Sequence, residues 1–201
     1  MSDTMPLILA LDVAGNPFKW VNYEDAAYYY AKDLVAWDLG GDGCVLRGGT
    51  QRRTGKQSLM EISSIIAIKG MKVSSIKGYS VPPLTNKALF RRDHNLCAYC
   101  GDTFSPSSLS RDHVRPKSKG GPDIWTNVVT ACETCNRHKN DRTPQEAKME
   151  LLYVPYAPNR SCFLILMNRN ILADQMDFLL AKSNHITHDR VMGERGLLRS
   201  R

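Results

Sequence analysis

Apolar residues near the start of the chain follow two periods. Residues 7–13 are apolar except for one aspartate, which predicts a buried strand. After Asn22, a suitable N-cap, apolar side chains recur at helical intervals across residues 23–37 and predict one helix. Shorter apolar runs at 44–46 and 64–68 predict two more strands. The pattern indicates a small α+β region over residues 1–82.

A pair of prolines at 82–83 marks the next boundary. Thr85 then caps a predicted helix that turns Leu89 and Phe90 inward and Arg91 and Arg92 outward.

The central part of the chain predicts two strands and a helix. Residues 109–114 alternate with period two, which places Asp112 and His113 on opposite faces of a strand. A basic, glycine-containing loop follows, and residues 125–130 suit a second strand. Residues 133–139 then form a short helix that ends at Asn140, a residue type common in left-handed caps. The expected order is strand, strand, helix.

Beyond this core the pattern becomes helical. Thr143 and Glu146 form a capping box with a proline between them, which predicts a helix to about residue 152. Residues 171–182 carry an apolar stripe that packs internally or pairs with another subunit, so a homodimer is one expected state. The chain is thus expected to divide into residues 1–82, 83–152, a C-terminal helical extension at 153–183 and a flexible basic tail at 184–201.

Four cysteines stand in two Cys-x-x-Cys pairs around the central core. They are Cys97, Cys100, Cys132 and Cys135. Four thiolates suit tetrahedral zinc, and because protein fills every position, such a zinc is structural. Two disulfides are the alternative, but no apolar stretch near Met1 resembles a signal peptide, which predicts a cytoplasmic, reducing location. A dithiol redox pair would need a strand-to-helix context that the pattern lacks.

These residues resemble the HNH endonucleases, in the bacterial branch with two Cys-x-x-Cys zinc knuckles. The resemblance covers residues 86–152 and is carried by Cys-Ala-Tyr-Cys-Gly at 97–101, Arg-Asp-His-Val-Arg-Pro at 111–116, Lys-Gly-Gly at 119–121 and the stretch 125–144. It implies an α+β fold with a ββα-metal core, and hydrolysis of DNA phosphodiester bonds. The last letter of the family motif, His or Asn, is here Asn136.

The chemistry of phosphodiester hydrolysis assigns roles within the motif. Attack by water needs a general base, and an imidazole, with a pKa of about 6.5, is suited to that task. His113 is the candidate. Asp112 and Asn136 offer hard oxygens that match one Mg²⁺ or Mn²⁺ ion and leave room for phosphate and water. The resemblance implies that Asn127 is no metal ligand but braces the loop and orients His113 through backbone hydrogen bonds.

Charge supports a nucleic-acid substrate. The chain carries 27 basic and 20 acidic residues, and residues 86–148 hold 11 of the former against 7 of the latter. Such an excess favours salt-sensitive phosphate contacts. The expected contacts are Arg91, Arg92, Arg115, Lys117, Lys119, Arg137, Lys139 and Arg142. DNA is the expected partner, and RNA stays open because its phosphates are alike.

The same residues also fit one other function. Asp, His and Asn are also ordinary turn and cap residues, so a zinc module that only binds nucleic acid is the alternative to an enzyme.

Membrane insertion is not expected, because the longest apolar run, at 162–167, falls far short of the roughly 20 residues that span a bilayer. The sequence does not predict a target site or the choice between nicking and double-strand cleavage.

Overall fold

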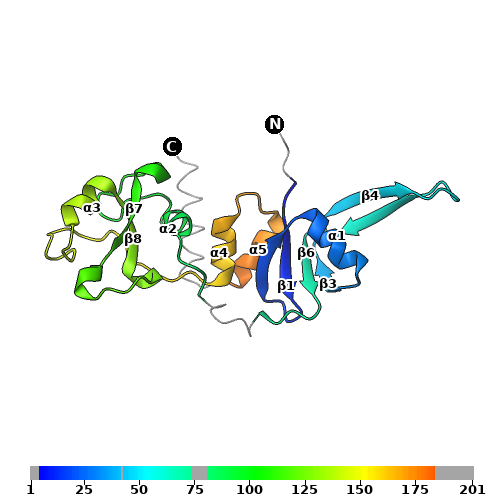
Figure 1. Ribbon diagram of the computed structural model, residues 1–201, viewed down its shortest axis with the longest axis horizontal. Coiled ribbons are helices and arrows are strands. Elements are labelled where there is room, and N and C mark those ends of the chain that lie inside the picture. Colours follow the sequence, from blue (N-terminus) through cyan, green and yellow to red (C-terminus); the bar gives the residue numbers. More distant parts are fainter. Residues whose placement is uncertain (1–4, 42, 74–80, 184–201) are drawn as a thin grey trace. The chain divides into compact units, whose positions relative to one another are not determined.

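The computed structural model describes residues 5–41, 43–73 and 81–183 (Figure 1). Its fold is α+β, with five α-helices among the described residues and several small sheets, as the sequence predicted. The chain forms two compact units. The first unit combines the described residues of 1–80 with those of 160–201, and the second unit consists of residues 81–159. Within the described ranges, no helix has both the length and the apolar character needed to cross a membrane.

The first unit is built on a four-stranded sheet in the order β2-β1-β6-β3. Its strands are β1 (Ile8–Asp12), β2 (Pro17–Val21), β3 (Val35–Leu39) and β6 (Ile65–Ile68). β1 and β6 run parallel at the centre, and β2 and β3 pair with them antiparallel. Every residue of both central strands is buried, which explains their continuous apolar runs.

Helices cover both faces of this sheet. Alternate residues of β1 and β6, such as Ile8 and Ile66, pack with α1 (Tyr23–Ala31). The intervening residues, such as Leu9 and Ile65, pack with α4 (Arg160–Met167) and α5 (Ala173–Ala181). The expected C-terminal extension is therefore part of the core of the first unit, because its apolar stripe fills the second sheet face. Residues 184–201, the expected tail, lie outside the described residues.

The first helix is shorter than predicted. Its N-cap is Asn22, whose side chain accepts a hydrogen bond from the Asp25 amide, but the helix ends at Ala31 and not near residue 37. Asp33 has a positive φ of 53°, which ends the helical path. The remaining apolar residues form β3, because pairing with the buried edge of β6 outweighs their helical spacing.

A long hairpin leaves the first unit. It consists of β4 (Cys44–Thr50) and β5 (Gln57–Ile62), paired antiparallel (Figure 1). The strand predicted at 44–46 is thus longer than expected. Neither β5 nor β2 was predicted, because their polar and apolar residues do not alternate clearly.

The second unit contains the predicted strand, strand, helix. β7 (Leu109–His113) pairs antiparallel with β8 (Val128–Cys132), and α3 (Glu133–Lys139) follows directly. The second strand begins three residues later than predicted, because Trp125–Asn127 form a 3₁₀ turn. Asn140 ends α3, as predicted, with a positive φ of 50°, but its ψ of −137° lies outside the left-handed helical region that was expected for this cap. α2 (Asn86–Arg92), capped by the Thr85 side chain, packs against both strands.

The predicted helix after Thr143 is a single turn. The capping box is present: the Thr143 amide donates to Glu146, and the Glu146 amide donates to the Thr143 hydroxyl. Lys148, with φ 54°, then ends the turn, and the Leu152 amide donates to the Ala98 carbonyl at 2.9 Å. This hydrogen bond holds the residues after Lys148 in an extended conformation against the first cysteine pair.

Candidate metal centre and active site

The four cysteines predicted to bind zinc lie together. Their sulfur atoms are all within 4.8 Å of one another. Cys97 and Cys100 follow α2 on a turn, whereas Cys132 ends β8 and Cys135 lies in the first turn of α3. A tetrahedral site with Zn–S bonds of about 2.3 Å suits such a cluster, so a zinc ion fits this set of donors. Zinc here would join α2, β8 and α3.

The thiols differ in how readily they lose a proton. Burial raises the pKa of Cys100 to about 11, and burial together with the neighbouring Cys132 raises the pKa of Cys135. Burial opposes ionisation of Cys97 too, but backbone amides donate to its sulfur and its pKa is lowered. Cys97 is therefore better prepared to bind a cation than Cys100 or Cys135, which would be deprotonated as the metal binds.

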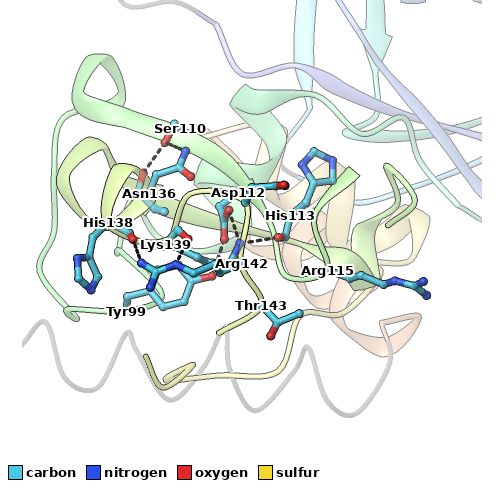
Figure 2. Close-up of polar contacts among 12 residues, drawn as sticks. Tyr99, Ser110, Asp112, His113, Arg115, Asn136, His138, Lys139, Arg142 and Thr143 are labelled. Atoms are coloured by element: carbon cyan, nitrogen blue, oxygen red, sulfur yellow. Dashed lines mark hydrogen bonds and ion pairs between the residues drawn. The ribbon is translucent and has the colours of Figure 1, made fainter. Parts of the chain in front are cut away.

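Asp112 is buried in β7 with both carboxylate oxygens held. Lys139 on α3 donates to Oδ1 at 2.9 Å, and the hydroxyl of Tyr99, from the first cysteine pair, donates to Oδ2 (Figure 2). The same ammonium donates to the His113 carbonyl at 2.8 Å. Each carboxylate oxygen has two lone pairs, so these bonds leave room for a cation.

Lys139 therefore does not lie where the sequence placed it. Its side chain is 1% exposed and cannot reach a phosphate on the surface. Arg92 is also buried, at 0% exposure: it pairs with Asp93 and donates to the carbonyls of Trp125, Tyr156 and Val128. Both predicted DNA contacts are wrong in this structure, because each cation satisfies buried acceptors.

Asp123, which the sequence did not single out, lies against His113. Its Oδ1 is 2.8 Å from Nε2 of His113, and the guanidinium of Arg111 donates to both of its oxygens at 3.0 Å. Arg111 and His113 are two residues apart on β7 and share a face. Burial acts against the charge of Asp123, but the bonds from Arg111 and His113 lower its pKa. Its carboxylate is therefore ionised and accepts hydrogen bonds. His113 and Asp123 are ten residues apart with a loop between them, and no sequence pattern predicts a contact at that separation.

The two asparagines make different contacts. The Asn127 side chain accepts from the Arg115 amide at 3.0 Å and donates to the carbonyls of Arg115 and Pro122. Backbone bonds of this kind hold the loop between β7 and β8. The Asn136 amide on α3 donates to the Ser110 hydroxyl at 2.7 Å, which turns its side chain toward β7 (Figure 2).

An open pocket of about 650 Å³ brings the motif together. Asp112, His113 and Asn136 all line it, although Figure 2 shows the His113 ring directed away from the Asp112 carboxylate. Glu133, Asp141, Ser110 and Ser118 add further oxygen atoms to its wall. These oxygen atoms suit a hard divalent cation such as Mg²⁺ or Mn²⁺, but four cationic residues, Arg111, Lys117, Arg137 and Lys139, line the same pocket.

Exposed cations surround the pocket. Lys117 and Arg137 line it, and Arg115, Lys119 and Arg142 are exposed nearby in the sequence, whereas Arg91 is half-buried. Lys119 also pairs with Glu146.

The ββα unit, its cluster of four cysteines and its pocket of polar and charged side chains define the class: a small α+β domain with a metal-binding cysteine site. Residues 97–152 match the model of a family described as HNH endonuclease. This segment is therefore similar to that family, which confirms the resemblance inferred from the motif. No curated protein matches the chain.

Proposed function

We propose that the protein is a metal-dependent endonuclease that hydrolyses phosphodiester bonds of DNA. The observation that supports this most strongly is the single pocket lined by Asp112, His113 and Asn136. The family match to residues 97–152 gives the class of enzyme, and the pocket supplies candidates for each task of the reaction.

His113 is the proposed general base. Since ionised Asp123 only accepts hydrogen bonds, the His113 nitrogen facing it, Nε2, carries the proton. The other nitrogen, Nδ1, then keeps its lone pair and takes a proton from water as the water oxygen attacks phosphorus. One P–O ester bond breaks, and the leaving oxygen gains a proton from solvent. Asn127 maintains the loop that carries Asp123.

Asp112 and Asn136 are the proposed ligands of one Mg²⁺ or Mn²⁺ ion. When bound, that ion would stabilise the negative charge that develops on the phosphate and leaving oxygen. Tyr99 and Lys139 hold the Asp112 carboxylate in one orientation. The four cysteines keep α3, and thus Asn136, in place beside β7.

The exposed cations are the proposed DNA contacts. They are Arg115, Lys117, Lys119, Arg137 and Arg142, and the half-buried Arg91 is proposed with them. Contacts of this kind hold any phosphate backbone, so they support nucleic acid in general and DNA through the family match.

One observation favours a second candidate, a zinc module that binds nucleic acid without cleaving it. Lys139 already neutralises Asp112, which weakens the attraction of that carboxylate for a cation. If this candidate is correct, Mg²⁺ has no effect on the protein.

Incubation of supercoiled plasmid with purified protein tests the two candidates. We expect nicked or linear products with added Mg²⁺ or Mn²⁺ and none with a His113→Ala variant of unchanged melting temperature. Labelled DNA and RNA of one sequence, digested in parallel, report the preferred substrate. Intact plasmid under every metal condition would exclude the nuclease and leave the binding module.

A further inference from the structure

The β4–β5 hairpin is far more exposed than the rest of its unit. Only its base is anchored: Cys44, Leu46 and Met60 pack against the core beneath α1. Every residue from 47 to 59 is exposed, on both faces of the ribbon. A two-stranded hairpin without a core of its own contributes little to folding. Its length therefore needs another explanation.

The hairpin carries an excess of positive charge. Residues 44–62 contain four basic residues and one acidic one, Glu61 near the base, whereas residues 5–43 contain two basic and six acidic ones. The four cations are Arg47, Arg52, Arg53 and Lys56. None of them forms an ion pair with any residue that the structure describes. This surface is complementary to a polyanion.

The tip of the hairpin favours nucleic acid over a lipid surface. Residues 50–57 are all polar, basic or glycine, and the exposed apolar residues Val45 and Leu59 lie nearer the base. Gly49 has an ordinary φ, and a side chain there would meet nothing within 4 Å. Since no internal contact requires glycine at this position, its small size suits close approach of the strand to a ligand.

We infer that the β4–β5 hairpin is a second DNA-contacting element and binds in the major groove of a duplex. The major groove of B-DNA admits a two-stranded β-ribbon, and the phosphates on its rims face the side chains of such a ribbon. Figure 1 shows the hairpin extending freely from the sheet and helices of its unit. The choice of DNA as partner rests on the proposed function, whereas the inference that the hairpin binds a nucleic acid rests on its own exposure and charge.

Duplex binding by the full chain without added divalent cation tests this inference separately from cleavage. Fluorescence anisotropy of a labelled duplex is measured over a range of salt for wild type and for Arg52→Gln/Arg53→Gln. We expect binding at least about tenfold weaker at ~0.1 M salt, and a plot of log affinity against log salt that is less steep by about two units. The matched control is Lys32→Gln/Arg169→Gln, which removes two exposed cations elsewhere in the unit and should bind as wild type does.

Circular dichroism verifies that both variants are folded, which is expected because the changed residues are exposed. Equal affinity and salt dependence of the hairpin variant and the control would overturn the inference. An RNA duplex separates groove binding from general phosphate attraction, because its deep, narrow major groove excludes side chains. We expect the hairpin substitutions to weaken binding to the RNA duplex less than binding to the DNA duplex. An equal loss of affinity for both duplexes would overturn the groove contact. Absence of plasmid cleavage would leave these results unaffected.

Discussion

Asp123 is the residue on which the proposed tautomer of His113 depends. It contacts the ring nitrogen and is itself held by Arg111, so its carboxylate has little freedom to turn. A carboxylate in this position orients the imidazole and stabilises the positive charge that appears after proton transfer.

We predict that Asp123→Ala lowers the single-turnover rate of plasmid nicking about 10–100-fold, in the range known for partners that orient an active-site group. Substrate affinity should change little, because Asp123 acts through His113. Glu150→Ala, at an exposed acidic position of the same unit, serves as the control. ¹⁵N NMR of the imidazoles should show a defined His113 tautomer in wild type that is lost in the variant. An unaltered tautomer would remove Asp123 from the mechanism.

Lys139 forms a buried ion pair with Asp112, and this has a measurable consequence for folding. Lys139→Met leaves the Asp112 carboxylate buried without its partner, which costs about 3–5 kcal/mol of unfolding free energy. Urea denaturation measures the loss. Lys117→Met, at an exposed position, should change stability by less than about 0.5 kcal/mol. Adding Asp112→Leu to Lys139→Met should restore part of the stability, since neither charge of this pair then remains buried. Similar effects of the two lysine substitutions would contradict the burial of Lys139.

At the scale of elements, the turn between β1 and β2 depends on an ionised side chain. The Asp12 carboxylate accepts from the backbone and side chain of Asn16 and from the Val73 amide. Burial raises the pKa of Asp12, but these bonds together outweigh burial and lower it. The folded state therefore prefers the ionised form. Its contribution to stability is present above the ordinary pKa of 3.8 and is lost as pH falls through the lowered value.

We predict that Asp12→Asn destabilises the first unit by about 1–3 kcal/mol near neutral pH, because an amide nitrogen cannot accept the bond from an N–H. The difference between variant and wild type should shrink as pH falls below about 4. Unfolding followed through Trp20 and Trp37, which lie in that unit, measures this. A difference that stays constant down to the lowest pH at which the unit folds would show that the charge of Asp12 is unimportant.

At the scale of the whole molecule, the two units depend on different forces. The first has a sheet covered by helices on both faces, whereas the second has a smaller apolar core, including Leu89, Trp125 and Val128, and the cysteine cluster beside it. Zinc binding is therefore expected to be part of the folding free energy of the second unit alone.

We predict that a zinc chelator unfolds residues 81–159 and leaves the other unit folded. The chain has three tryptophans, of which Trp125 reports the second unit and Trp20 and Trp37 the first. Emission should respond to chelator in a Trp20→Phe/Trp37→Phe variant and stay constant in Trp125→Phe. Cys132→Ser should reproduce the chelator effect. A response from both reporters would mean that the units unfold together.

Local spacing was enough to predict much of the second unit. The two Cys-x-x-Cys pairs, the alternation of β7, the Thr85 cap and the end of α3 at Asn140 involve residues within a few positions of one another. Contacts between residues a few positions apart follow from backbone geometry, so the residue types and their spacing are enough to predict them. The candidate residues Asp112, His113 and Asn136 came instead from the resemblance to the HNH family and from the chemistry of hydrolysis, and their roles stay a prediction.

Contacts between distant residues were decided only by the tertiary structure. The first helix ends at Ala31 because β3 pairs with β6, and the last two helices join the first unit because its sheet has a second apolar face to cover. Arg92 and Lys139 are buried because carboxylates and carbonyls from other elements surround them. Asp123 reaches His113 because a loop folds back over β7. The amino-acid sequence determined which local elements and metal ligands exist, whereas long-range burial and pairing determined where charged side chains lie, since the cost of burying a charge depends on its partners in space.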